Sequence, residues 1–372
     1  MAEPWIVGVL FSQTGITGFV EQTQLQATLL AIEEINAAGG ILDRPIQPII
    51  YDPGSEPEGY RRFATQLLAD DGVSVIFGCC TSRCRKPVVP LVERRNALLF
   101  YSAIYEGFEY SPNVIYTGAA PNQSSVQLAR YLINHHGKRF CFIGSDYVFS
   151  RESNRVMREL VEDMGGSVLS EAYLEIHSSR AAFDPVAHKI AALRPDVIFS
   201  TVVGINTGYL YEACRAAGLD SRTVPIASLT TSEAEVALMS REAAVGHITG
   251  APYFHTVETP ANRRFVAAYR RRFGPDAVTN MSAEAAYFQV HIFAGALGMT
   301  GRADPDSLVP AMLGLQVDAP QGRIMIDPDN NHTFLWPRIG RINDHGLFDI
   351  LEESPSAVRP DPYLVSYRYA AA

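Results

Sequence analysis

Residues 75–82, VIFGCCTS, and residues 97–102, ALLFYS, decide the fold, because each runs a short apolar strand into a loop of hydroxyl, thiol and aromatic side chains. In an open α/β sheet, ligands lie outside the carboxyl ends of the strands, where backbone N–H groups and short side chains converge. Two such segments in succession predict a pocket for a small polar molecule. Neither loop carries groups that would make the pocket reactive.

Strand and helix patterns alternate on both sides of this stretch. Residues 5–11 have the pattern of a buried strand, and apolar residues at helical spacing follow between 25 and 35. The alternation restarts near residue 122, which predicts a second lobe of the same kind. The predicted fold is therefore α/β, with two Rossmann-like, doubly wound parallel-sheet lobes joined by a multi-crossing hinge.

The length of 372 residues exceeds what one hydrophobic core usually sustains. We expect the N-terminal lobe to contain residues 1–121 and about 252–330. We expect the C-terminal lobe to contain residues 122–251 and about 331–372. Because the chain then passes between the lobes several times, the two halves should move as a hinged pair.

The composition excludes several classes of protein. A formal net charge of -9 argues against the phosphate-neutralising surface of a nucleic-acid-binding protein. No apolar segment has the roughly 20 residues needed to span a bilayer. The N-terminus shows no export signal, and five cysteines without disulfide spacing fit a reducing compartment. We therefore expect a cytoplasmic protein, or a periplasmic one if an export signal has been removed.

No known catalytic motif is present, and we predict no enzyme activity, no cofactor and no metal site. The chain has no G-x-S-x-G elbow, phosphate-binding loop or dinucleotide-binding G-x-G-x-x-G. Glu106 and Glu109 are interpreted as solvated loop carboxylates rather than an acid/base pair. A redox role for Cys80 or Cys84 stays open, because Cys80 lies at the edge of the predicted pocket.

Several segments carry a family resemblance, and they occur in order over almost the whole chain. They are residues 35–41 (INAAGGI), 85–86 (RK), 105–113 (YEGFEYSPN), 120–123 (APNQ), 143–147 (IGSDY), 151–154 (RESN), 199–204 (FSTVVG), 227–236 (ASLTTSEAEV) and 319–322 (APQG). With these segments the chain resembles type I periplasmic-binding proteins, close to the amide-sensing regulators of aliphatic amidase operons and to urea-binding transport receptors.

The resemblance implies two lobes that close over a small neutral amide-like ligand. Amide sensors of this type are negative regulators that sequester an RNA-binding antitermination protein, which would be the partner here. The alternative is a substrate-binding protein that delivers urea, short amides or branched-chain amino acids to an ABC permease. A homo-oligomer is left open.

The resemblance also assigns ligand contacts. The first lobe contributes Ser82 and Tyr101. The second lobe contributes Tyr147 and the loop Thr201 to Gly204. Thr230 is a weaker candidate, because it could instead cap a helix. The full predicted set is Cys80, Thr81, Ser82, Tyr101, Ser102, Ala103, Ile104, Tyr147, Phe149, Thr201, Val202, Val203, Gly204 and Thr230. Hydroxyl groups suit an amide, because a hydroxyl both donates and accepts.

Departures from the family pattern change the expected ligand. Cys80 stands where the amide sensors have tyrosine, Ala103 replaces a hydroxyl residue, and Phe149 replaces tyrosine. These changes should leave more space and less polar walls. The sequence therefore predicts a ligand larger or more apolar than acetamide, such as a longer or aromatic amide.

Overall fold

The first lobe is built on a five-stranded sheet in which every neighbouring pair is parallel. The computed structural model describes residues 3–365, so the ends of both predicted lobes (residues 1–2 and 366–372) lie outside the described residues. The strand order is β2-β1-β3-β4-β5. The strands are β1 (Trp5–Leu10), β2 (Ile46–Tyr51), β3 (Val75–Gly78), β4 (Leu98–Tyr101) and β5 (Val114–Tyr116).

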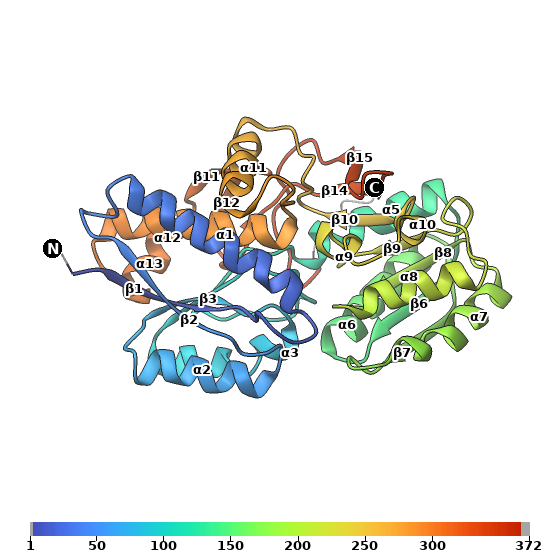
Figure 1. Cartoon of the computed structure of the whole chain (residues 1–372), viewed down its shortest axis with the longest axis horizontal. Helices are drawn as coiled ribbons and strands as arrows, with labels where there is room; N and C mark the ends of the chain where they lie inside the picture. The colour runs from blue at the N-terminus through green and yellow to red at the C-terminus, as the bar shows by residue number, and fades with distance from the viewer. Residues whose placement is uncertain (1–2, 366–372) are drawn as a thin grey trace.

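Helices cover both faces of this sheet. They are α1 (Gly18–Ala37), α2 (Pro57–Ala69), α3 (Ser82–Arg85), α4 (Val89–Arg95), α11 (Pro260–Phe273), α12 (Met281–Thr300) and α13 (Pro305–Met312). Figure 1 shows α1 and α12 side by side above the sheet and α2 below it. In β4, Leu98 and Phe100 pack toward α1 and α12, whereas Leu99 and Tyr101 pack toward α2 and α4. This burial on both faces explains why the inner strands β3 and β4 are continuously apolar.

The second lobe contains a seven-stranded sheet with the order β15-β14-β10-β9-β8-β6-β7. The five strands from β10 to β7 are parallel, while β14 and β15 extend the sheet in antiparallel fashion. The strands are β6 (Arg139–Ser145), β7 (Ser167–Leu174), β8 (Val197–Thr201), β9 (Ile226–Ser228), β10 (Ile248–Ala251), β14 (Arg338–Ile342) and β15 (Phe348–Glu353). The helices are α5 (Ser125–His135), α6 (Val148–Asp163), α7 (Asp184–Leu193), α8 (Asn206–Ala216), α9 (Glu233–Val236) and α10 (Arg241–Ala244), with 3-10 turns η1 (Pro121–Gln123) and η2 (Arg180–Ala182). The prediction of two parallel-sheet α/β lobes is confirmed.

The chain passes between the two large sheets three times, after β5, after β10 and before β14. A small antiparallel sheet precedes the third passage and consists of β11 (Gln316–Ala319), β12 (Gly322–Ile326) and β13 (Thr333–Phe334). That passage therefore lies between Phe334 and Arg338. Among the described residues, no helix is both long and apolar enough to cross a membrane.

Candidate functional site

A cavity of about 60 Å³ lies between the lobes, at the carboxyl ends of the parallel strands. Its walls come from the loops after β3, β4, β6, β8 and β9 and from the first turns of α1, α9 and α12. The lining residues are Thr17, Val20, Cys80, Thr81, Ser82, Ala103, Ile104, Tyr147, Phe149, Val203, Gly204, Thr230, Glu235, Met281 and Ser282. The cavity thus lies at the edge where the sequence predicted a pocket.

The predicted site residues divide into two groups. Cys80, Thr81, Ser82, Ala103, Ile104, Tyr147, Phe149, Val203, Gly204 and Thr230 line the cavity, whereas Tyr101, Ser102, Thr201 and Val202 do not. Tyr101 donates its hydroxyl hydrogen to the carbonyl oxygen of Cys80 at 2.6 Å. Thr201 donates to Asn154 Oδ1 at 3.0 Å. These two side chains therefore stabilise the loops after β3 and β8 without facing the cavity themselves.

The other two residues outside the lining have similar supporting contacts. The hydroxyl of Ser102 accepts a hydrogen bond from Gln24 Nε2 at 3.0 Å. The carbonyl oxygen of Val202 accepts from the hydroxyl of Thr230 at 3.0 Å. Ser102 therefore ties the β4 loop to α1, and Val202 fixes the position of a residue that does reach the cavity.

The loop after β3 reaches the cavity through an unusual backbone conformation. Cys79 has φ of 68°, which is uncommon for a residue other than glycine, and its N–H donates to Leu10 on the neighbouring strand at 3.0 Å. Thr81 then accepts a hydrogen bond from Cys84 N at 3.3 Å and starts α3. The turn at Cys79 directs Cys80, Thr81 and Ser82 toward the second lobe.

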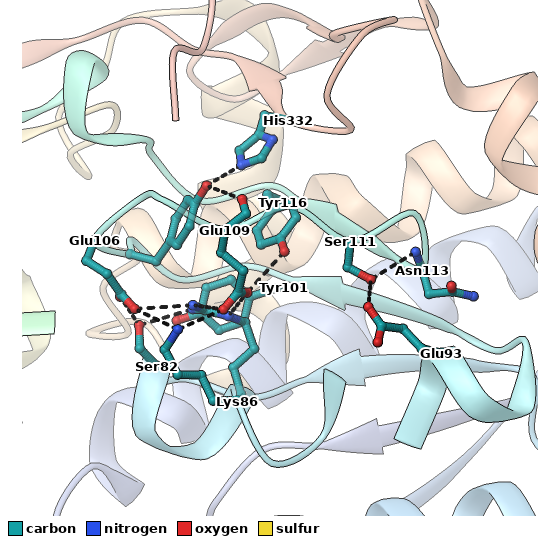
Figure 2. A network of polar contacts seen from close by, with 12 residues as sticks. Ser82, Lys86, Glu93, Tyr101, Glu106, Glu109, Ser111, Asn113, Tyr116 and His332 are labelled. Atoms are coloured by element: carbon teal, nitrogen blue, oxygen red, sulfur yellow. Dashed lines mark hydrogen bonds and ion pairs between the residues drawn. The ribbon is translucent and has the colours of Figure 1, made fainter. Parts of the chain in front are cut away.

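A buried ionic cluster lies next to Ser82 (Figure 2). It consists of Ser82, Arg85, Lys86, Glu106 and Glu109, and we call it the Arg85 cluster. Arg85 is fully buried, and its Nε donates to Glu109 Oε1 at 2.8 Å. Burial opposes ionisation of Glu109, but the charge and hydrogen bonds of Arg85, with those of Lys86, outweigh it and lower its pKa to about 2. The prediction of solvated carboxylates is wrong for Glu106, which is only 2% exposed, because Arg85 pairs with both glutamates.

Three of the six hydroxyl groups on the cavity wall, those of Thr17, Ser82 and Thr230, donate to protein acceptors. Thr17 donates to Glu21 Oε1 at 2.6 Å and lies 2.9 Å from Ser55 Oγ, and Thr230 donates to Val202 as described above. The hydroxyl groups of Tyr147 and Ser282 have no hydrogen-bond partner within residues 3–365, and the Thr81 hydroxyl only accepts, from Cys84 N. Toward a ligand, Thr17 and Thr230 therefore offer lone pairs, while Tyr147, Ser282 and Thr81 can donate.

Glu235 is the acidic residue of the cavity wall, and sequence reasoning did not single it out. Its Oε2 accepts from Ser232 N at 2.9 Å and from Ser232 Oγ at 2.5 Å, which completes a capping box on α9. Burial raises the pKa of Glu235 to about 7, against the lowering effect of the hydrogen bonds from Ser232. The spacing Ser232-x-x-Glu235 was the sequence signal that could have placed this carboxylate at a strand end.

The remaining lining residues that sequence reasoning missed come from helix starts. Thr17 and Val20 lie at the beginning of α1, and Met281 and Ser282 at the beginning of α12. Neither helix follows one of the two strands that drew attention to the pocket. In the part of the chain that the structure describes, no lysine or arginine lines the cavity.

The two lobes touch around the cavity. Ile205 N, in the second lobe, donates to Ile16 O in the first at 3.3 Å, and the side chains of Ile16, Phe149, Ile176 and Val203 form one buried apolar cluster. At the rim, His177 Nε2 lies 3.2 Å from Glu56 Oε1. The lobes are therefore in a closed arrangement that limits the size of the cavity.

The cysteines and acidic residues show no arrangement for redox or metal chemistry. All five cysteines are free thiols, and burial raises the pKa of Cys84 to about 12 and that of Cys80 well above its ordinary value. Such thiols hold little of the reactive thiolate at neutral pH. Over residues 3–365, no group of three or more His, Cys, Asp or Glu side chains could hold a metal ion.

The family comparison agrees with this geometry. A model described as periplasmic binding protein domain matches residues 5–369. The chain belongs to this family. Its members are ligand-binding proteins rather than enzymes. The resemblance inferred from the sequence segments is thereby confirmed at the level of the family.

Curated relatives are distant but extend over most of the chain. A Leu/Ile/Val-binding protein homolog of Brucella suis is 22% identical over 289 residues, which cover 75% of this chain and 73% of that protein. A leucine-, isoleucine-, valine-, threonine- and alanine-binding protein of Pseudomonas aeruginosa is 20% identical over 323 residues, with coverage of 84% and 83%.

Solved structures show the same fold. The solute-binding protein of an ABC transporter from Rhodopseudomonas palustris, in complex with 3,4-dihydroxybenzoic acid, superposes with a TM-score of 0.87 at 23% identity and covers 96% of this chain and 99% of its own. A branched-chain amino acid transporter substrate-binding protein from Streptococcus pneumoniae, in complex with isoleucine, reaches 0.84 at 19% identity, with coverage of 96% and 100%.

Proposed function

We propose that this chain is a substrate-binding receptor of the kind that serves ABC transporters, and that its ligand is a small, uncharged molecule rich in N–H donors, such as a short aliphatic amide or a urea. The observation that carries this proposal is the chemistry of the cavity wall. Lone pairs of Thr17 and Thr230 and the carboxylate of Glu235 face the ligand, and no cationic side chain does. An amide satisfies this wall with its two N–H groups, and its carbonyl oxygen can accept from Tyr147.

The same wall disfavours an aromatic acid. A carboxylate without a cationic partner would be buried next to Glu235, and an uncompensated buried charge is costly.

The transport role is supported by the family and by the relatives, which include ABC transporter solute-binding proteins and amino-acid-binding proteins. A transport receptor of this kind would work in the periplasm. A second candidate is an amide-responsive negative regulator that sequesters an antitermination protein in the cytoplasm. It is supported by the sequence segments described above and by an acceptor-lined cavity suited to amides.

A thermal-shift screen tests the ligand class. Acetamide, butyramide, urea, isoleucine and 4-hydroxybenzoate are each added at millimolar concentrations, because a four-heavy-atom amide has a ceiling of about 6 kcal/mol at roughly 1.5 kcal/mol per atom. A ligand that binds only the folded state raises the melting temperature by mass action. We expect amides or urea to stabilise the protein. Stabilisation by 4-hydroxybenzoate or isoleucine alone would show that the proposed ligand class is wrong.

The gene neighbourhood separates the two roles. A transport receptor predicts an export signal in the genomic reading frame and adjacent genes for a permease and its ATPase. A regulator predicts an adjacent gene for an RNA-binding antitermination protein. In that case the two purified proteins should form a complex that an amide dissociates, which gel filtration would detect.

A further inference from the structure

The hydroxyl of Ser82 is held from two sides before any ligand arrives. Ser82 lines the cavity but is only 1% exposed. Its hydroxyl donates to Glu106 Oε2, and its oxygen accepts from Arg85 Nη1 at 3.1 Å. Figure 2 shows the carboxyl group of Glu106 pointing at Ser82 from the neighbouring loop. Both partners belong to the Arg85 cluster.

The chemistry of the two partners fixes the direction of these hydrogen bonds. A guanidinium group has donors and no acceptor, so Arg85 can only donate to Ser82. An ionised carboxylate only accepts, and Glu106 Oε1 lies 3.5 Å from Arg85 Nη2 and 3.6 Å from Lys86 Nζ. The single hydrogen of Ser82 therefore belongs to Glu106. One of its two lone pairs is taken by Arg85, and one remains for the cavity.

We propose that Glu106 and Arg85 are positioning residues that make Ser82 an acceptor-only group, and that they thereby select ligands presenting an N–H to the first lobe. This inference rests on the proposed function, because it assigns an orientation to an amide or urea in the same cavity. The N–H end of the ligand lies against Ser82. A ketone or ester of the same shape leaves the Ser82 lone pair without a donor and is rejected.

The surroundings of Arg85 keep this arrangement in place. Glu109 binds its other edge, with distances of 2.8 Å to Nε and 3.2 Å to Nη2. The guanidinium also lies over the rings of Tyr101 and Tyr105, at 4.5 Å and 4.9 Å from their centroids. Glu109 is itself held by the hydroxyl of Tyr116 at 3.1 Å. Arg85 therefore has no other rotamer available without unpairing buried groups.

The proton position can be observed without a ligand. Neutron diffraction from crystals of the unliganded protein soaked in heavy water would locate the deuterium on Ser82 Oγ. We expect it on the line to Glu106 Oε2. A deuterium directed into the cavity overturns the inference, whichever ligand the protein binds.

Ligand selectivity gives a second, independent test. Butyramide and methyl propyl ketone have the same shape, but the amide has an NH₂ group where the ketone has a CH₃ group. The ratio of their dissociation constants therefore measures how strongly the protein prefers a ligand with N–H groups. In Glu106→Gln the new amide can donate to Ser82 Oγ, which frees the serine hydrogen to point into the cavity. We expect wild type to prefer butyramide and the variant to reduce this ratio at least about fivefold, the size of one neutral hydrogen bond.

A matched control is available on the same lobe. Glu93 accepts from the hydroxyl of Ser111 at 2.8 Å, which is the same serine-carboxylate pairing away from the cavity (Figure 2). Glu93→Gln should leave the ratio unchanged. If Glu106→Gln weakens both probes by the same factor, Glu106 has only a structural role and the inference is wrong. If neither probe binds wild type, the proposed ligand class fails, and the neutron result alone decides the role of Glu106.

Discussion

Ile205 N donates a hydrogen bond to Ile16 O across the boundary between the lobes, at 3.3 Å. The neighbouring Gly204 makes this approach possible, because a Cβ added there would lie 2.6 Å from Ile16 O. Gly204 also has φ of 68°, a left-handed conformation that glycine adopts without penalty. The closed state thus depends on a missing side chain at the cavity wall.

Gly204→Ala should weaken ligand binding by hindering closure. We expect at least a tenfold loss of affinity for butyramide, corresponding to about 1.4 kcal/mol, and no ligand-induced decrease of the radius of gyration in X-ray scattering. The matched control is Gly218→Ala, which has φ of 81° but no heavy atom within 4 Å of the added Cβ. The control carries the same backbone strain, so equal losses of affinity in both variants would rule out a steric role at the lobe boundary.

Two cavity-region tyrosines should respond in opposite ways to loss of the hydroxyl. Tyr147→Phe removes a group with no partner in the described part of the chain, so it should weaken amide binding and leave the melting temperature of the unliganded protein unchanged. Tyr101→Phe removes the donor to Cys80 O, so it should lower the free energy of unfolding by about 1 to 3 kcal/mol. Titration calorimetry with butyramide measures the first effect, and unfolding in guanidinium chloride without ligand measures the second. A stability loss in Tyr147→Phe would contradict the assignment of its hydroxyl to the ligand.

The Arg85 cluster should be important for stability as well as selectivity. Arg85→Met leaves two acidic side chains buried without their main cation, and breaking a buried ion pair from one side costs about 3 to 5 kcal/mol. Lys86→Met removes a cation whose side chain is 44% exposed and should cost less than about 1 kcal/mol. Unfolding of both variants in guanidinium chloride provides the comparison. Equal effects would mean that the cluster is solvated in solution.

The fold could be predicted from the sequence because its signals are local. Strands such as β3 and β4 are buried on both faces and therefore appear as short uninterrupted apolar runs between helical patterns. The strand-end rule also placed Cys80, Thr81 and Ser82 at the cavity. Tyr101 was harder to place, because it is the last residue of β4 and its side chain lies on the α2 side of the sheet.

Other parts of the site depend on contacts between distant segments, which spacing alone does not reveal. Met281 and Ser282 reach the cavity because α12 returns to the first lobe after the five parallel strands of the second sheet. The partner of Arg85 is Glu109, 24 residues away. Glu106 is buried because it also pairs with Arg85. In the sequence alone, the segment around Glu106 resembles an ordinary polar loop. The spacing of Ser232 and Glu235 indicates a capping box in the sequence, but only the structure shows that Glu235 lines the cavity.

Buried glutamates should make the protein less stable as the pH rises. Glu233 is buried, and its Oε1 accepts from His255 N, while its Oε2 has no hydrogen-bond partner among residues 3–365. Burial, with a smaller contribution from Glu235, raises the pKa of Glu233 to about 8. A carboxyl group whose pKa is higher in the folded than in the unfolded state binds more protons when folded. Its contribution to stability is therefore full below the unfolded value, near 4.5, and is lost as the pH rises through about 8.

Glu233→Gln removes this titration while retaining an acceptor for His255 N. We expect the variant to be more stable than wild type at pH 8.5 by a few kcal/mol, since each unit of pKa shift corresponds to about 1.4 kcal/mol, and to show little difference at pH 5. Unfolding in guanidinium chloride at both pH values measures the change, and Glu258→Gln, at an exposed position, is the control. A gain of equal size at both pH values would show that relief of the unpaired oxygen, rather than protonation, accounts for the effect.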